Sequence, residues 1–289
     1  ELLALDRLSF ADWLARENLG GAPLTWYCDY ACRDDFGARP AQTSAWAGLH
    51  YFAARPADET VLTWPEGNGW LTRRLAEPLK DRLKTGALVF RVEESRGGVE
   101  VDWLDASTGE ARRVRAKAAV VCVPRFAAAR VVSALAGEVA VTAAFVYPPW
   151  MTANLHVTDA PNGVGSDPAW DNVLHRGDSL GYVNAAHQAM GPVGRDSVWT
   201  YYRPFPDGDP AANRAALHAR PWAAWKDMVL ADLGGALPGL EASVRRLDVW
   251  LWGHGMVRPS VGFMWGKERA LAARPRGRIH FGHSDLSGF

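Results

Sequence analysis

Four aromatic side chains lie close together near the end of the sequence, in residue types that can line a cavity for an organic molecule. The sequence predicts one strand–turn–strand unit that carries Trp250, Trp252, Phe263 and Trp265. Aromatic rings exclude water from a bound molecule, and their faces attract a cationic amine. The competing interpretation is core packing, because most of the 14 tryptophans of the chain must be buried. We take Trp252 as the candidate residue of the cavity wall.

Two histidines are candidates for moving a proton near such a molecule, since imidazole titrates close to neutral pH. His254 lies between Gly253 and Gly255, whose backbone freedom permits a close approach to a ligand. The alternative is a histidine in an ordinary turn. His187 follows an expected strand at Leu180–Ala186, where it is either a proton carrier or a polar group that ends the strand. We predict catalytic roles for both histidines together with the tryptophan of the cavity wall.

Other catalytic arrangements are missing from the sequence. It contains no G-x-S-x-G elbow, no H-E-x-x-H helix and no phosphate-binding P-loop. The three cysteines, Cys28, Cys32 and Cys122, are too few for a disulfide framework, and the first two have no second pair to complete a zinc site. We expect reduced, mostly buried thiols and no metal.

The composition is that of a globular protein with no preference for polyanions. Of the 289 residues, 48% are hydrophobic and 22% are charged, with 32 basic residues balanced by 32 acidic ones. Without a net field there is nothing to attract nucleic acid, and the length allows one or two domains. No apolar run reaches the roughly 20 residues that a membrane span requires. We expect a soluble protein with a small-molecule partner and leave its oligomeric state open.

Both ends of the sequence are predicted to be cuts through a longer protein. The first residues, ELLALDRLSFADWL, begin inside a helical pattern, and the last, HFGHSDLSGF, stop without a closing element. No basic segment followed by an apolar run marks a signal peptide. Because a signal can precede the given sequence, its patterns do not distinguish a cytoplasmic from a periplasmic location.

The elements that must position these residues begin with a small helical layer over residues 1–55. Ser9 is the expected cap of a helix in this layer, with Asp12 three residues on. Apolar side chains at helical spacing predict two more helices, one through Leu24–Ala31 and one through Trp46–Phe52.

From residue 61 the pattern changes to a helix followed by strands. The helix carries leucines every four residues, at Leu71, Leu75 and Leu79. Residues from Ala87 to Trp103 alternate as strands do and are joined by polar turns into a β-meander. The meander ends in Ala118–Val123, which is apolar on both sides, so we expect this strand to be buried between two layers.

Residues 131–275 return to a mixture of strands and helices. The expected strands are Thr152–Val157, Leu180–Ala186, Ser197–Arg203 and Val244–Trp252. Between them, a helix that begins at Pro221 carries an apolar stripe of Trp222, Trp225, Met228, Val229 and Leu233. A last short strand is expected at Arg278–Gly282.

Four segments give the sequence its resemblance to a known family. In chain order they are Pro65–Leu71 (PEGNGWL), Ala119–Pro124 (AVVCVP), Val249–Gly255 (VWLWGHG) and Phe281–Gly288 (FGHSDLSG). They resemble, in turn, four parts of the flavin amine oxidase superfamily: the Gly-rich turn and helix, the strand that ends in proline near the flavin, the aromatic strand of the substrate cavity, and the last flavin-contacting motif. Together they span almost the whole chain, which makes the set more specific than any one segment.

The resemblance implies an α+β / α/β fold in which the chain passes back and forth between two domains. A mixed-sheet substrate domain with helices is expected over residues 1–58 and 131–276. A partial FAD-binding, Rossmann-like domain with the β-meander is expected over 59–130 and 277–289. The implied cofactor-binding residues are Gly67, Gly69, Pro124, Gly282, His283 and Ser284. For the first two glycines the plainer explanation is a turn before a helix, which needs glycine anyway.

Several departures from the family pattern limit what the resemblance implies. The family's first element is a strand, a G-x-G-x-x-G turn and a helix that holds the pyrophosphate, and it does not occur in the sequence. We therefore expect FAD in the complete protein but no tightly held FAD on this chain. Met151–His156 lacks the lysine that oxidases of the family commonly place near the flavin, so an oxidase and a dehydrogenase both stay open. His283 replaces the usual glutamate, and no cysteine there can bond a flavin.

These inferences predict a fragment of an FAD-dependent, amine oxidase-like oxidoreductase. When complete, it would oxidise an amine or a similar organic substrate by hydride transfer to flavin; the fragment itself is expected to be inactive. One alternative is a carbohydrate-binding or glycosidase domain, because acidic residues are scattered along the chain and tryptophan is abundant. Another is a purely structural fragment. The residues do not choose among polyamine, aromatic amine, amino acid and polyene substrates.

Overall fold

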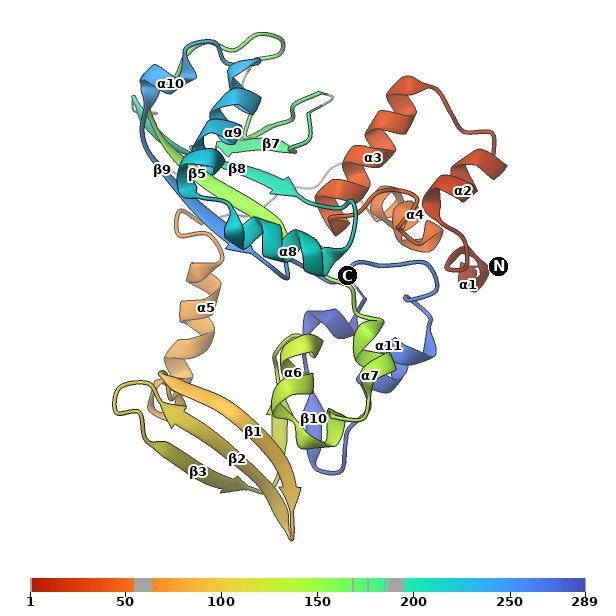
Figure 1. The fold of residues 1–289 in the computed structure, drawn as a ribbon, viewed down its shortest axis with the longest axis vertical. Helices are drawn as coiled ribbons and strands as arrows, with labels where there is room; N and C mark the ends of the chain where they lie inside the picture. Colours follow the sequence, from red (N-terminus) through yellow and green to blue (C-terminus); the bar gives the residue numbers. More distant parts are fainter. Residues whose placement is uncertain are drawn as a thin grey trace.

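The computed structural model of the chain describes residues 2–54, 64–167, 169–175, 177–184, 186 and 195–288. Figure 1 shows a helical layer at the N-terminus, a five-stranded sheet covered by helices, a helix with a three-stranded sheet, and a small parallel sheet among short helices. The predicted domain boundaries at residues 58, 130 and 276 stay predictions, and the first of them lies outside the described residues.

The helical layer consists of α1 (Leu2–Leu5), α2 (Phe10–Arg16), α3 (Ala22–Phe36) and α4 (Ala45–Ala53). The predicted cap of α2 is confirmed, because the Ser9 side-chain oxygen accepts the Asp12 backbone N–H at 3.0 Å. α2 and α4 approach closely at Gly48, where a side-chain carbon would lie 2.4 Å from Cγ of Phe10. Phe10 shares one buried cluster with side chains of α3 and α4, so the predicted helices form a layer with its own core.

A helix and an antiparallel sheet follow, with α5 (Gly69–Ala76), the 3₁₀ helix η1 (Glu77–Arg82), β1 (Ala87–Ser95), β2 (Gly98–Asp105) and β3 (Ala111–Ala116). The sheet order β1-β2-β3 confirms the predicted β-meander. The leucine stripe runs over α5 and η1 and is not covered by the described part of the chain, since Leu71, Leu75 and Leu79 are 40%, 72% and 45% exposed. The spacing of the leucines thus marks a helix face that the described residues leave open.

Residues near the C-terminus join the middle of the chain in a two-stranded parallel sheet. β10 (Ile279–Phe281) pairs with β4 (Ala119–Val121). Short helices surround the pair, namely α6 (Arg125–Val131), η2 (Ser133–Leu135), α7 (Val139–Ala143), α11 (Lys267–Ala272) and η4 (Ser284–Leu286) (Figure 1). The prediction that β4 is buried on both sides is wrong: Val121 is buried, but Val120 is 65% exposed. Cys122 is likewise exposed, whereas Cys28 and Cys32 are buried as expected.

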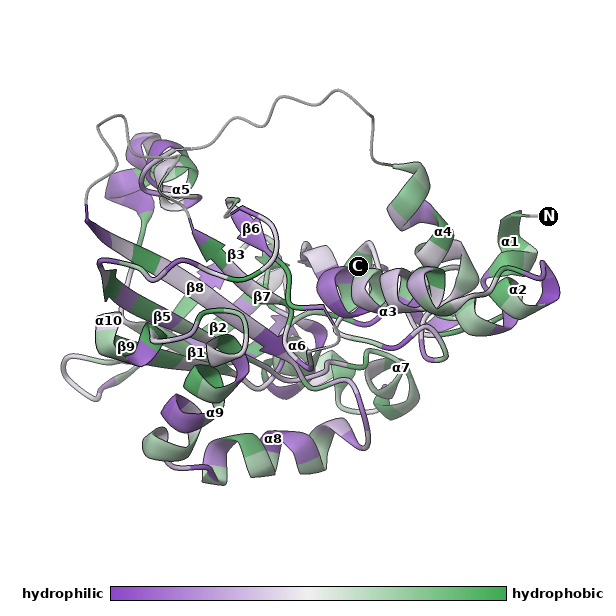
Figure 2. Cartoon of the chain, turned by 90° about the horizontal axis from the view of Figure 1, so that it is seen from above, coloured by the Kyte–Doolittle hydropathy of each residue, from purple (hydrophilic) through white to green (hydrophobic). Residues whose placement is uncertain are grey.

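The five-stranded sheet has the order β6-β7-β8-β5-β9, and each neighbouring pair is antiparallel. Its strands are β5 (Trp150–Thr158), β6 (Asp171–Asn172), β7 (Gly181–Asn184), β8 (Asp196–Pro204) and β9 (Val244–Trp252). The helices beside it are α8 (Pro210–Ala219), α9 (Trp222–Gly234) and α10 (Leu240–Ser243). The four predicted strands of this region are therefore confirmed, and Figure 2 shows α8 and α9 on one side of the sheet.

Alternation along β5 separates the two faces of this sheet. Met151, Leu155 and Val157 share a buried cluster with Val229 and Leu233 of α9. This contact confirms that the apolar stripe predicted for α9 is buried on one side. Trp222, the first residue of the stripe, is 55% exposed. Because successive side chains point to opposite faces, the even-numbered residues of β5 face away from α9.

A buried ion network ties the short helices to the turn before β10. The carboxylate of Glu138 accepts hydrogen bonds from Arg125 at 2.7 Å and from Arg276 at 2.6 Å. The side chain of Arg125 is only 2% exposed, so its charge depends on this partner. The network joins α6, the start of α7 and the segment that leads into β10.

Replacing Glu138 by glutamine is expected to lower the free energy of unfolding by about 3 kcal/mol at pH 7, because Arg125 is left buried without its carboxylate. Hydrogen bonds from Arg276 and Arg125 hold the pKa of Glu138 below its ordinary value, so the ionised form stabilises the fold. The loss should be complete above about pH 4.5, the ordinary value, and should shrink as the pH falls through the lowered pKa. Urea unfolding at several pH values measures this difference.

Glu110→Gln is the matched control. Glu110 pairs with Arg112 at 3.1 Å, but the two side chains are 67% and 43% exposed, so solvent screens the pair. Its effect on unfolding should be much smaller than that of Glu138→Gln. Equal losses in the two variants would show that burial adds nothing to the Glu138 network.

Candidate functional site

The sheet face that points away from α8 and α9 carries a row of exposed rings. In the strand register Thr152 lies opposite Trp250 of β9 on one side and Tyr202 of β8 on the other. Trp252 follows on the same face of β9, and its Nε1 donates a hydrogen bond to Oγ1 of Thr152 at 3.0 Å. Trp250 and Trp252 are 43% and 51% exposed. We call Thr152, Tyr202, Trp250 and Trp252 the open face.

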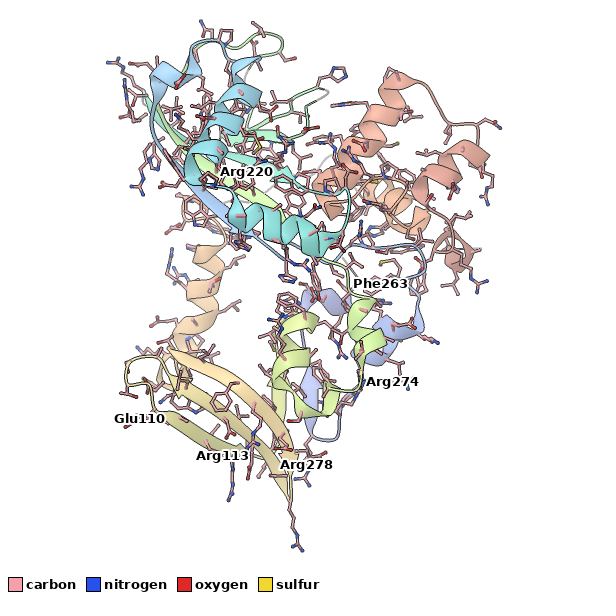
Figure 3. The ribbon with its side chains drawn as sticks, in the orientation of Figure 1. Glu110, Arg113, Arg220, Phe263, Arg274 and Arg278 are labelled. Carbon is pink, nitrogen blue, oxygen red and sulfur yellow. The ribbon has the colours of Figure 1, made fainter. Side chains whose placement is uncertain are left out.

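The predicted strand–turn–strand unit around these rings forms only in part. β9 carries Trp250 and Trp252 as expected, but residues 261–265 are turns and not a second strand. Phe263, labelled in Figure 3, is buried against Phe145, with ring centroids 4.9 Å apart. Trp265 lies edge-on to Trp46 at 5.5 Å and is 50% exposed, so it is a surface ring outside β9. The β9 rings share one sheet face, and we take them as the candidates for the cavity wall.

α3 covers one end of the open face. Tyr30 of α3, Trp150 of β5 and Leu180 form a buried cluster, against which Tyr202 packs. The Tyr202 hydroxyl donates to the Asp171 carboxylate at 3.0 Å. Burial raises the pKa of Asp171, while the bond from Tyr202 opposes the shift. This end of the face therefore presents an acid that gains a proton more readily than an exposed aspartate.

The far side of the face is polar. Thr200 donates its hydroxyl to Oδ1 of Asn154 at 2.9 Å. His156 is the next residue of β5 on this face, and it lies 3.5 Å from the carboxylate of Asp248. The same carboxylate also binds Arg246 at 2.8 Å. These contacts satisfy one another, so the rings and the acid of the other end are the groups that are free to meet a ligand.

His254 is placed by ring stacking just beyond β9. Its ring lies on Phe126, with centroids 3.9 Å apart and planes 18° apart, and edge-on to Tyr147 at 5.7 Å. Burial lowers its pKa, and the charges of Arg214 and Arg130 act in the same direction. His254 is therefore neutral at pH 7 and can accept a proton.

The glycine after His254 has a packing role that the sequence did not reveal. A side-chain carbon on Gly255 would lie 2.2 Å from Cδ1 of Trp150, so the indole occupies the space of a side chain. A carbon on Gly253 would meet Cδ of Arg214 at 3.3 Å, a tight contact. Packing against Trp150 is thus enough to explain why residue 255 is a glycine, without a ligand that approaches its backbone. The other predicted catalytic histidine, His187, lies outside the described residues.

The predicted cofactor residues fall on separate elements. Gly67 has φ +59, with no atom within 4 Å of a side-chain position, and it precedes α5, which begins at Gly69. The positive φ supports the plainer explanation of a turn that needs glycine. Figure 1 shows α5 apart from α6 and β10, and the remaining predicted residues lie just before α6 and just after β10.

Pro124, Gly282, His283 and Ser284 come together where β4 and β10 end. Pro124 caps α6, and the backbone N–H of Gly282 donates to the carbonyl of Val121 at 3.1 Å. His283 caps η4, which begins at Ser284, because its Nδ1 accepts the backbone N–H of the residue at position 285 at 3.1 Å. These four residues therefore share one edge of the small parallel sheet, and their roles in cofactor binding stay predictions.

Asp285 anchors this edge, a role that its position in the sequence did not predict. It is 4% exposed, and its carboxylate accepts the backbone N–H of Arg125 at 2.9 Å and the hydroxyl of Tyr147. Burial raises the pKa of Tyr147, and the bond to Asp285 adds to the shift. An aspartate directly after the quoted Gly-His-Ser was visible in the sequence, but its partners lie more than a hundred residues away.

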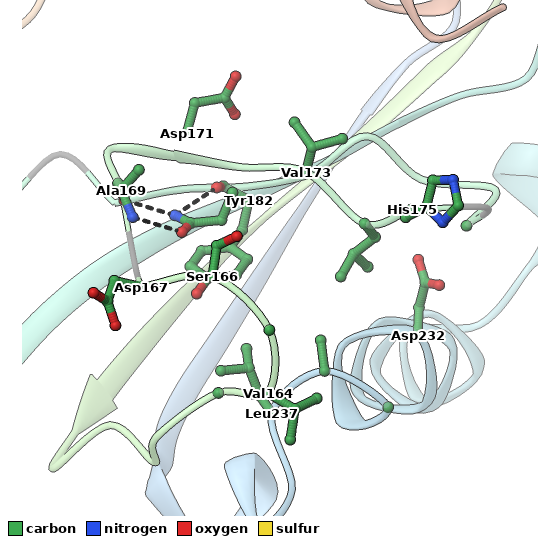
Figure 4. A pocket seen from close by; sticks show the side chains of 17 residues that line it. Val164, Ser166, Asp167, Ala169, Asp171, Val173, His175, Tyr182, Asp232 and Leu237 are labelled. Carbon is green, nitrogen blue, oxygen red and sulfur yellow. Dashed lines mark hydrogen bonds between the residues drawn. The ribbon is translucent and has the colours of Figure 1, made fainter. Parts of the chain in front are cut away.

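A further hollow lies elsewhere in the described part of the chain (Figure 4). It measures about 760 Å³ and is bounded by the segment from Gly163 to Gly177 and by the end of α9. Tyr182, Asp232 and Leu237 line it from the helix-covered side of the sheet. Asp171 lies at its rim and also binds Tyr202 of the open face. We place the candidate site on the open face, where the exposed rings are.

The described residues contain neither a metal-binding cluster nor a membrane-spanning helix. Within them, His, Cys, Asp and Glu side chains do not gather in groups of three that could hold a metal ion. No helix of the described ranges has the length and apolar character needed to cross a bilayer.

The arrangement of elements is the fold of FAD-dependent oxidoreductases of the amine oxidase type. The chain superposes on cyclohexylamine oxidase from Brevibacterium oxydans IH-35A with a TM-score of 0.69 at 16% identity, over 98% of this chain and 63% of that one. It matches putrescine oxidase bound to putrescine with a TM-score of 0.67 at 16% identity, over the same shares. A CLA-producing fatty acid isomerase from P. acnes follows, with a TM-score of 0.65 at 17% identity, over 98% and 62%.

At these identities the likeness establishes the fold and leaves the chemistry open. The chain spans about 63% of the length of the first two of these proteins. No model of a known protein family matches it, and no curated protein matches its sequence. The predicted resemblance to the flavin amine oxidases is confirmed at the level of fold, and the roles of individual residues stay predictions.

Trp252→Ala is expected to lower the free energy of unfolding by about 1 kcal/mol or less, because half of the ring is already exposed and a single hydrogen bond is lost. Trp150→Ala is the matched comparison, since Trp150 is the register partner of Trp252 but is only 7% exposed. Its loss should be about 3–5 kcal/mol. Urea unfolding measures both. A large loss in both variants would make Trp252 a core residue and remove it from the cavity wall.

Proposed function

We propose that this chain handles the substrate of an FAD-dependent oxidoreductase that, in complete form, oxidises an amine or a similar organic molecule by hydride transfer to flavin. The observation that carries the proposal is the exposed pair Trp250 and Trp252, on a sheet that follows the fold of two amine oxidases over 98% of the chain. A sheet face built only for packing would cover these rings.

The open face suits a small organic cation. Faces of Trp250 and Trp252 attract a positive charge, and the rings exclude water from the reacting carbon. Asp171 lies at the other end of the face, beside Tyr202, and supplies an opposite charge or a proton acceptor. Neutral His254 lies two residues beyond Trp252 and is a second proton acceptor. These side chains orient a substrate and move a proton.

The described residues fit FAD in part. Gly282 and Pro124 meet at the end of β4, and a side-chain carbon on Gly282 would make only an ordinary contact of 3.5 Å with Sγ of Cys122. Packing therefore does not require a glycine there, which leaves room for a ligand. The sequence has no G-x-G-x-x-G turn to hold the pyrophosphate. We propose that the chain forms one edge of a flavin site and alone holds FAD weakly; a bound flavin would accept the hydride.

The proposal covers both oxygen and other electron acceptors. On the open side β5 presents Thr152, Asn154 and His156, and none of its residues is a lysine. The fold comparisons favour an oxidoreductase over the carbohydrate-binding or glycosidase alternative.

The test follows the oxidised flavin absorbance of the natural, FAD-loaded polypeptide that contains this chain, without oxygen, after separate additions of amines and glycans. Amines should bleach the band because they reduce the flavin, and glycans should not. Trp252→Ala should slow the bleaching by at least about 10-fold, since orientation of the reacting bond is lost.

Trp222→Ala is the matched control. Trp222 is 55% exposed, like Trp252, but it begins α9 and its Nε1 donates to the carbonyl of Leu247 at 3.3 Å. This variant should bleach at the unaltered rate. The proposal fails if a chemical reductant bleaches the flavin and no amine does. Equal slowing in the two variants would remove the open face from the site.

A further inference from the structure

Arg258 is a buried cation without a counter-ion in the described part of the chain. It is 9% exposed, its Nε has no hydrogen-bond acceptor among the residues that the structure describes, and burial alone lowers its pKa. The other deeply buried arginines have carboxylate partners: Arg33 binds Asp29 at 2.8 Å, and Arg125 binds Glu138 at 2.7 Å. A guanidinium stays charged at any physiological pH, so an unpaired one is costly to bury.

Arg258 lies on a seam between two segments that are distant in the sequence. Its backbone N–H donates to the carbonyl of Val146 at 2.8 Å, so residues 255–258 run beside the stretch that enters β5. The next residue, Pro259, accepts the backbone N–H of Ser44 at 2.8 Å, at the start of α4. The seam is therefore the contact of residues 255–260 with residues 37–44 and the start of β5.

Two more buried donors without partners border the same seam. The hydroxyl of Ser44, on a fully buried residue, has no hydrogen-bond partner among the described residues. Nε1 of Trp150 is also buried and unpartnered there, and it lies 2.6 Å from a side-chain position on Gly37. The same indole packs against Gly255 at the other side of the seam. An indole N–H and a guanidinium can only donate hydrogen bonds.

A seam with three donors and a positive charge lacks an acceptor that carries negative charge. We propose that Arg258, with Ser44 and Trp150, binds an oxyanion, the carboxylate or phosphate group of a small ligand. The guanidinium fork matches two oxygens of such a group, and charge-assisted hydrogen bonds are the strong ones in a buried place. The site lies beside the open face, because Trp150 is the register partner of Trp252, and it adds an anionic group to what the protein recognises.

The test measures thermal unfolding of the 289-residue chain in sodium chloride, sodium acetate and sodium phosphate at equal ionic strength. The matching oxyanion should raise the midpoint saturably, by about 5 °C at a concentration near a hundred times its dissociation constant. Acetate and phosphate distinguish a carboxylate from a phosphate ligand. Arg258→Met should lose the specific shift, and Arg258→Lys should keep a weaker one. General salt effects are equal in all variants and cancel in the comparison.

Arg113→Met is the matched control, because Arg113 is an arginine with two carboxylate partners, Asp102 at 2.6 Å and Glu100 at 2.8 Å, and it lies on β3, outside the seam. It should keep the oxyanion shift although its own midpoint falls. In chloride, Arg258→Met should unfold no earlier than the unaltered chain, since it removes an unpaired charge. If Arg258→Met does not fold, Ser44→Ala takes its place and should weaken the shift.

An oxyanion shift of the same size in Arg258→Met and the unaltered chain overturns the proposal. So does the absence of any difference between chloride and the oxyanions, which would mean that water satisfies the seam. The assay uses neither flavin nor amine, so its outcome is independent of the proposed oxidoreductase function.

Discussion

The alternation of side chains along β5 is the constraint on which the rest of the structure depends. β5 pairs with β8 on one edge and β9 on the other, so its residues set the two faces of the whole sheet. Met151 and Leu155 are fully buried beneath α9. Thr152 and its partners across the strands, Tyr202 and Trp250, must therefore lie on the opposite face of the sheet. A slip of one residue would exchange these sets and bring the apolar core into water.

Trp150 joins the open face to the rest of the molecule. Its indole packs with Tyr30 of α3, fills the space beside Gly37 and lies against Gly255 after β9. The helical layer, the sheet and the chain that leads to the small parallel sheet thus meet on one side chain. Trp252 lies opposite Trp150 in the strand register but is half exposed, because α3 packs on Trp150 and not on Trp252. Trp150 is therefore a structural anchor, and the neighbouring Trp252 is a candidate ligand contact.

Local features were predictable from the sequence because they depend on neighbours along the chain. The Ser9 cap, the strands of the large sheet and the buried side of the α9 stripe follow from spacing and were all found. The exposed leucines of α5 and the exposed Val120 were not predicted, since an apolar pattern marks a face without saying what covers it. The expected second strand near Phe263 also failed, because buried aromatics pack equally well from turns.

By itself the sequence determined the types of element, their order, and a set of four motifs specific enough to indicate the fold. It also placed Trp250 and Trp252 on one side of a strand, because side chains alternate with a period of two. Only the tertiary structure decided that this side is open, that the Trp150 indole fills the space beside Gly255, and that Arg258 has no counter-ion among the described residues. Those facts depend on distances between segments far apart in the chain, which no local pattern of residues encodes.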